Sequence, residues 1–217
     1  MLLTYCYNSK MESISDIKKE RELVWLQILY LFLIPILLLY YKVIGNDFRI
    51  LMLLTVAVLI YGIARYEKWN HEDFGIKKKW TKDFLPYLIF TICGVIFLFI
   101  VEEFEIGKPF LNWWKNEKFL LLFIPLSVLQ EVIFRGVLMN MLRRVFKNPI
   151  FIIGLNASLF ALMHVIYLNS AFVLPVTFVA GIGFAWMYYK YQNLFLISAS
   201  HTILNFVGMI LGFFVLR

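Results

Sequence analysis

Residues 130–136 read QEVIFRG and lie inside an apolar stretch that covers residues 119–141. Glu131 and Arg135 are the two charged residues of that stretch. Residues four positions apart share one face of a helix, so these side chains are placed to form an ion pair. An ionisable group at membrane depth costs about 2.5–3.5 kcal/mol on insertion scales, and such residues usually serve a function. The stretch therefore predicts a membrane-spanning helix with a functional site in it.

The rest of the composition agrees with a membrane protein. Of 217 residues, 62% are hydrophobic, 18% are aromatic and 16% are charged, which is too apolar for a soluble domain of this size. The apolar residues come in blocks, and a membrane-spanning helix needs about 20 of them. We predict an all-α, polytopic transmembrane helix bundle of about seven spans, at residues 24–45, 50–65, 85–101, 119–141, 149–167, 171–189 and 194–214.

The net charge of +7 is explained by membrane topology. If the N-terminus is cytoplasmic, fourteen Lys and Arg residues fall in inside segments and six in outside segments. Cytoplasmic loops carry such an excess, and it also suits anionic lipid headgroups. The expected partners are membrane lipids and a peptide or membrane-protein substrate, with no nucleic acid, and the oligomeric state is left open.

The chain divides into three parts by charge and polarity. Residues 1–23 form a charged cytoplasmic segment without the apolar core of a cleavable signal, and we expect Met11 to be the true start. Residues 24–117 form scaffold spans and their loops. Residues 118–217 carry the polar side chains that lie within otherwise apolar segments, and we expect the catalytic-type domain there.

Those side chains suit hydrolysis of an amide bond. Glu131 is a candidate general base that activates water, and Arg135 would fix its rotamer. His164 is a second candidate for the water. His201 and Asn205 share a helix face, and both can donate hydrogen bonds to a developing oxyanion. Together they suffice for hydrolysis without a covalent intermediate.

Other interpretations of the same residues stay open. Glu131, His164 and His201 are candidate ligands for one zinc ion with an open fourth position, and a metal-independent mechanism is equally plausible. Polar residues can also pin helices together, or line a proton or solute path. A transporter is less favoured, because the two halves show no matching pair of interrupted spans. The sequence has no HExxH helix, CxxC motif or phosphate-binding glycine loop, which argues against zincins and NTPases.

Three motifs in the second half resemble the CPBP family of intramembrane proteases, also called the CAAX-protease/bacteriocin-processing or Abi family. The first family motif is EExxxR followed by Gly, here residues 130–136. The second is FxxxH, here Phe160 to His164. The third is HxxxN or HxxxD, here His201 to Asn205. The resemblance covers residues 118–210, with the three motifs in the family's order and spacing.

This resemblance implies a membrane helix bundle whose site lies beneath the cytoplasmic surface. Eukaryotic members remove the last three residues of prenylated CAAX proteins, and bacterial members are linked to peptide maturation, bacteriocin self-immunity and signalling. The family mechanism uses its first Glu and the histidine that corresponds to His164 to activate water, while the positions of His201 and Asn205 support the oxyanion. The expected location is a bacterial plasma membrane, with the site facing the cytoplasm.

The sequence departs from the family pattern at the first position. Gln130 stands where the family has its first Glu, and a carboxamide can hold a water but cannot take its proton. Glu131 is one residue, about 100° of helix, away, and the second Glu of the motif more naturally pairs with the arginine. Two hypotheses follow. Either Glu131 replaces the missing base in an intramembrane endopeptidase, or the protein is a catalytically silent pseudoprotease that binds a membrane partner.

Overall fold

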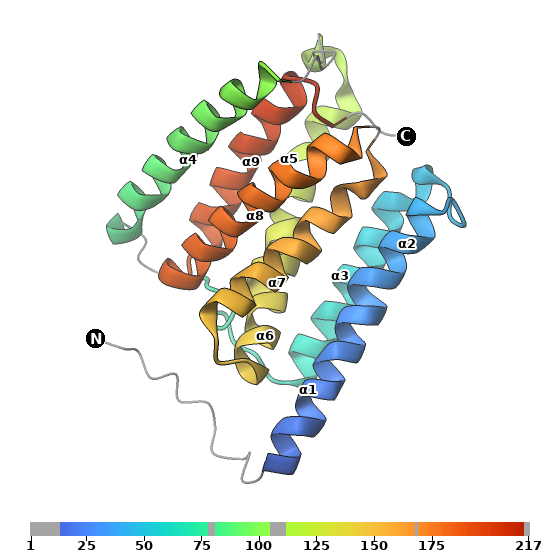
Figure 1. The fold of residues 1–217 in the computed structure, drawn as a ribbon, viewed down its shortest axis with the longest axis vertical. Helices are drawn as coiled ribbons and strands as arrows, with labels where there is room; N and C mark the ends of the chain where they lie inside the picture. Colours follow the sequence, from blue (N-terminus) through green and yellow to red (C-terminus); the bar gives the residue numbers. More distant parts are fainter. Residues whose placement is uncertain (1–13, 78–80, 105–111, 168, 215–217) are drawn as a thin grey trace.

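The protein is a bundle of helices. The computed structural model describes residues 14–77, 81–104, 112–167 and 169–214, and in this part of the chain it contains no strand. The expected start at Met11 lies outside the described residues. The prediction of an all-α bundle is confirmed (Figure 1). The α-helices are α1 (Ile14–Ile28), α2 (Ile34–Tyr40), α3 (Arg49–Tyr66), α4 (Thr81–Glu102), α5 (Glu117–Glu131), α6 (Met139–Val145), α7 (Pro149–Leu162), α8 (Ser170–Tyr191) and α9 (Leu194–Ile210).

Six helical segments of the described residues are long and apolar enough to cross a membrane. The last apolar helix, α9, is shorter at 17 residues. Together they correspond to the seven spans expected from the sequence. The six longer segments are Asp16–Tyr40, Arg49–Tyr66, Thr81–Glu102, Leu121–Val145, Pro149–Ile166 and Ser170–Tyr191.

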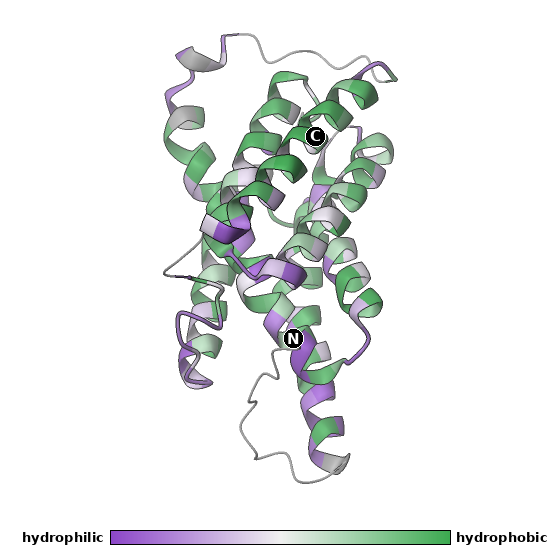
Figure 2. Ribbon diagram, turned by 90° about the vertical axis from the view of Figure 1, so that its left-hand side faces the viewer, coloured by the Kyte–Doolittle hydropathy of each residue, from purple (hydrophilic) through white to green (hydrophobic). Residues whose placement is uncertain are grey.

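Hydropathy follows this arrangement. Hydrophobic residues dominate the spans, while hydrophilic residues gather in the connections and in the first turns of α1 (Figure 2). Many large apolar side chains face outward, such as Val58 at 69% exposed, Leu121 at 74% and Ile150 at 82%. A soluble protein rarely exposes so much apolar surface, and lipid tails are its natural cover. The chain is an integral membrane protein.

Asparagine side chains set where three helices of the second half begin. The carboxamide oxygen of Asn116 accepts from the backbone N–H of Phe119, 2.9 Å away, and thereby caps α5. Asn148 caps α7 and Asn193 caps α9 in the same way, each satisfying backbone donors that the first turn leaves unpaired. α8 ends at Gln192, whose φ of 45° is left-handed, so the chain reverses within two residues into α9.

The second half forms the packed centre of the bundle. α7 packs along α8, and α9 lies between α4 and α5, while α1, α2 and α3 cover the other side of the molecule (Figure 1). Gly181 allows α8 to approach α7 closely, because a Cβ at this position would lie 3.1 Å from Cδ1 of Phe160 and 3.2 Å from Cα of Ala157. The close approach brings Phe160 into the middle of the bundle.

Two spans contain a π-helical stretch, which holds one more residue per turn than an α-helix. η1 (Leu29–Leu33) joins α1 to α2 just before Pro35, and η4 (Val132–Leu138) joins α5 to α6. Such stretches occur often at functional sites. η4 begins directly after Glu131 and contains Arg135, so the wide turn coincides with the motif that the sequence singles out.

Candidate active site

Glu131 and Arg135 form the predicted ion pair. Nη1 of Arg135 lies 3.3 Å from Oε1 of Glu131, and both side chains are completely buried. The guanidinium also packs over aromatic rings, 4.4 Å from the ring centroid of Phe160 and 5.3 Å from that of Phe184, and its Nη2 donates to the carbonyl of Gly181 at 3.4 Å. The cation is therefore enclosed by one carboxylate, one carbonyl and the faces of rings, which attract positive charge.

His201 reaches the same carboxylate from α9. Its Nδ1 lies 2.7 Å from Oε1 of Glu131. Oε2 of Glu131 has no hydrogen-bond partner among the described residues. Glu131, Arg135 and His201 therefore make one buried polar group in the interior, which we call the ionic cluster.

His164 lies apart from the ionic cluster, beside a cavity. It is in the short 3₁₀ helix η5 (Met163–Ile166) that continues α7, and its Nδ1 is 3.0 Å from the carbonyl oxygen of Phe160. A carbonyl oxygen can only accept, so Nδ1 of the neutral imidazole carries the proton and Nε2 keeps the basic lone pair. The cavity measures about 180 Å³, and His164 and Gln130 both line it.

The structure thus divides the predicted site residues between two environments. Gln130 and His164 face the cavity, whereas Glu131 is not among the residues that line it. The ring of Phe160 packs beside a histidine of each environment, 5.1 Å from the ring of His164 and 5.5 Å from that of His201, measured between centroids. Asn205 lies elsewhere again, and its carboxamide donates to the hydroxyl of Ser127 at 3.3 Å.

The wall of the cavity includes residues that the sequence did not single out. Its far side consists of apolar side chains from the first two spans, and Arg49 and Tyr167 lie at its end. Arg49 was identifiable only as a basic residue at the start of a span, and the apolar lining residues carry no sequence signal that separates them from lipid-facing neighbours. Those contributed by the first two spans are Leu31, Phe32, Pro35, Ile36, Leu39, Ile50, Met52, Leu53 and Val56.

The three candidate zinc ligands do not come together as a ligand set. Among the described residues, no group of three or more His, Cys, Asp and Glu side chains is placed to hold a metal ion. Glu131 and His201 are in contact, but His164 directs its Nδ1 to the carbonyl oxygen of Phe160. This donor arrangement does not fit a three-ligand zinc site.

The fold and the site define a polytopic membrane protein with ionisable residues buried in its last four apolar helices. Residues 110–207 match the family model described as type II CAAX prenyl endopeptidase Rce1-like. This match agrees with the CPBP resemblance of the motifs. The match contains all six predicted site residues. No curated protein and no solved structure matches the chain.

Proposed function

We propose that the protein is an intramembrane endopeptidase that hydrolyses a peptide bond in a peptide or membrane-anchored substrate, with His164 as the general base. The observation that carries this proposal is the orientation of His164. Its Nδ1 is held by the Phe160 carbonyl, which leaves Nε2 as the basic atom of a residue that lines the cavity. The family of residues 110–207 supports the reaction class.

In this proposal the imidazole of His164 first accepts a proton and later returns it. Nε2 of His164 takes a proton from a water that the Gln130 carboxamide holds, and the resulting hydroxide attacks the peptide carbonyl carbon. The protonated imidazole then donates to the departing amine nitrogen, so the C–N bond breaks and the products are a carboxylic acid and an amine. Neither Asn205, whose carboxamide donates to Ser127, nor His201 lines the cavity, so the proposal gives these two residues no contact with the oxyanion in this arrangement.

Glu131 is assigned a positioning role in the proposal. Its Oε1 lies near both Arg135 and His201, and the residue does not line the cavity. The carboxylate thereby links α5 to Arg135 of η4 and to His201 of α9. If Glu131 were the base instead, its unpaired Oε2 would be the reacting atom.

A catalytically silent pseudoprotease is the second candidate, and a specific observation favours it. The side chain that lines the cavity at the family's first glutamate position is Gln130, which has no basicity at neutral pH. A protein of this kind would keep the cavity to bind a membrane partner.

A peptide-library assay in lipid nanodiscs separates these possibilities. Wild type, His164→Gln, Glu131→Gln and Gln130→Glu are compared on a quenched library, each with and without a chelator. We expect wild-type cleavage and a loss of about 10²–10⁴-fold in His164→Gln, because a general base contributes that much. Gln130→Glu should cleave faster than wild type, because it adds a carboxylate base to the cavity.

The other outcomes are equally informative. Cleavage that survives in His164→Gln and disappears in a folded Glu131→Gln protein would make Glu131 the base. Cleavage that appears only in Gln130→Glu would establish the pseudoprotease. Loss of wild-type cleavage with the chelator would show a metal requirement.

A further inference from the structure

The two ends of the bundle differ in charge. One end is formed by residues 67–77, 146–148 and 192–193, which follow α3, α6 and α8, and we call it the basic end. The described parts of the predicted inside segments lie toward this end, and the full sequence of those segments holds fourteen of the 21 Lys and Arg residues. The opposite segments hold six, and Arg135 is the remaining one. Because cytoplasmic segments carry the Lys and Arg excess, the basic end is the cytoplasmic one.

The cavity lies in the other half of the bundle. Its lining includes Leu39 near the end of α2, Arg49 at the start of α3 and Tyr167 just after η5. These positions are all at the end opposite the basic end, where α2 connects to α3 (Figure 1). From there the lining continues inward to Phe134, about midway along the span that contains η4. We call this end the cavity end.

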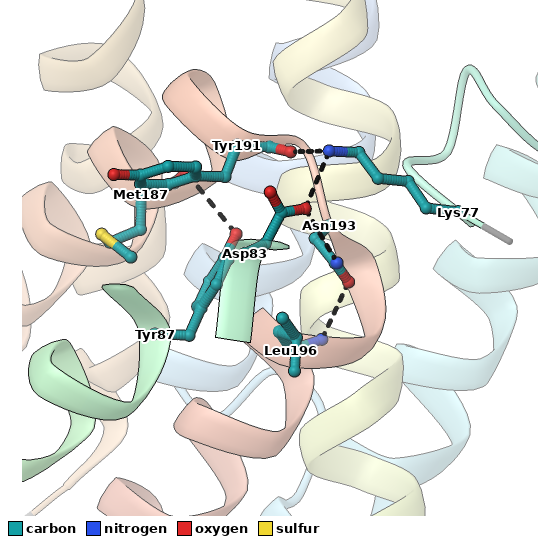
Figure 3. A network of polar contacts seen from close by, with 7 residues as sticks. All are labelled: Lys77, Asp83, Tyr87, Met187, Tyr191, Asn193 and Leu196. Atoms are coloured by element: carbon teal, nitrogen blue, oxygen red, sulfur yellow. Dashed lines mark hydrogen bonds and ion pairs between the residues drawn. The ribbon is translucent and has the colours of Figure 1, made fainter. Parts of the chain in front are cut away.

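Polar contacts join distant segments at the basic end, where a second pocket is lined by residues that include Arg21, Arg144 and Lys147. Nζ of Lys77 lies 2.9 Å from Oδ2 of Asp83 and also donates to the carbonyl of Tyr191, and the carboxamide of Asn193 donates to Asp83 at 3.2 Å (Figure 3). The backbone N–H of Leu194 also donates a hydrogen bond to the carbonyl oxygen of Gly75, 2.9 Å away. Further contacts at this end are those of Asn140 with the Asp73 carbonyl and of Arg144 with Glu20 and Glu67.

We propose that the cavity receives its substrate from the extracytoplasmic side of the membrane. The charge distribution places the basic end in the cytoplasm, and the cavity that Gln130 and His164 line reaches toward the opposite end. The substrate class is then an exported peptide, or the outward-facing segment of a membrane-anchored protein. The word substrate rests on the proposed function, but the sidedness of the cavity does not. The cavity then faces the opposite side of the membrane from the one that the family resemblance implies for the site.

The test uses two exposed aromatic residues at the two ends of α3. Phe48, 56% exposed, precedes α3 at the cavity end, and Tyr66, 88% exposed, ends it at the basic end. Phe48→Cys and Tyr66→Cys are made in the full chain with Cys6 and Cys93 changed to Ser. Each variant is labelled with a membrane-impermeant maleimide in intact cells and again after permeabilisation. Melting in detergent shows that each variant is folded.

We expect Phe48→Cys to be labelled in intact cells and Tyr66→Cys only after permeabilisation. The reverse pattern, or labelling of both residues in intact cells, would overturn the proposal. A second measurement uses an impermeant quenched peptide that the purified enzyme cleaves. Intact spheroplasts with wild-type protein should cleave it and those with His164→Gln should not. Cleavage only after lysis would overturn the extracytoplasmic access.

The two proposals fail in distinguishable ways. If the purified protein cleaves nothing, the proposed function fails while the labelling still decides which end of the bundle is outside. If purified protein cleaves and labelling places Phe48 in the cytoplasm, the endopeptidase stands and the extracytoplasmic access fails.

Discussion

Gln130 and Glu131 are neighbours in the chain and lie in different surroundings. Gln130 lines the cavity, and Glu131 lies in the ionic cluster with Arg135 and His201. One residue is about 100° of helix, so adjacent side chains cannot serve the same place without a change in rotamer or helix rotation. The exchange of the family's first glutamate for glutamine therefore removes a carboxylate from the cavity, and the carboxylate that remains is part of the interior.

The ionic cluster predicts a large loss of stability when its charge balance is broken. Glu131→Gln keeps the side-chain size but leaves the Arg135 cation buried without its partner, and breaking a buried pair in this way costs about 3–5 kcal/mol. The double variant Glu131→Gln, Arg135→Met removes both charges and should recover most of that loss. Thermal melting of the three proteins in the same detergent measures the difference. A single variant that melts at the wild-type temperature would contradict the role of the pair.

Several side-chain relations could be predicted from spacing alone. The Glu131–Arg135 pair is confirmed, because positions four apart on a helix meet, and the rings of Phe160 and His164, also four apart, lie 5.1 Å from each other. The roles of the six site residues in catalysis stay predictions. Spacing could not show that His201 approaches Glu131 or that Phe160 also packs beside His201, because both depend on how separate helices pack.

The α7–α8 contact depends on a glycine in a way that a matched variant can show. Gly181→Ala places a methyl group 3.1–3.3 Å from atoms of Phe160 and Ala157, and overpacking of this kind costs about 1–3 kcal/mol. We expect a lower melting temperature, because the added methyl group must displace Phe160. We also expect reduced cleavage, because Phe160 packs beside both histidines. Gly154→Ala is the control on α7, since a Cβ there meets nothing within 4 Å. It should leave activity unchanged and raise helix stability by up to about 1 kcal/mol.

Most helices could be predicted from the apolar blocks, and their ends less well. The expected span at 119–141 corresponds to Leu121–Val145, and the expected span at 24–45 corresponds to Asp16–Tyr40. The differences arise because a hydropathy block does not show where hydrogen bonding begins. α1 begins within charged sequence, and the side-chain caps at Asn116, Asn148 and Asn193 set the starts of α5, α7 and α9. The π-helical stretches had no signal in the pattern of apolar residues.

The cavity is shared between the family segment and the first two spans. Residues 110–207 supply Gln130 and His164, while η1, α2 and α3 supply the apolar wall that faces them. The sequence suggested that these first spans serve as scaffold, since they hold no ionisable side chain within their apolar stretches. Their part in the cavity could not be predicted, because an apolar residue that faces a cavity looks the same as one that faces lipid.

A bulky residue in the first span should therefore block the reaction from outside the family segment. Ile36 lines the cavity and is 7% exposed, so Ile36→Trp should fill much of the 180 Å³ space and displace the substrate. We expect cleavage to fall by about 10²-fold, the cost of a misplaced substrate. Leu37→Trp is the control, because Leu37 is 44% exposed and absent from the lining. Equal activity in the two variants would show that the cavity is not the reaction site.

The division of the cavity between two stretches of chain also has an evolutionary consequence. The wall from the first two spans and the groups that face it are separated in sequence by α4, so a single recombination event between them exchanges one without altering the other. A single genetic step can then replace the apolar wall of the cavity while the polar residues that face it are kept. Diversity of target among such proteins should accordingly be concentrated in their amino-terminal thirds.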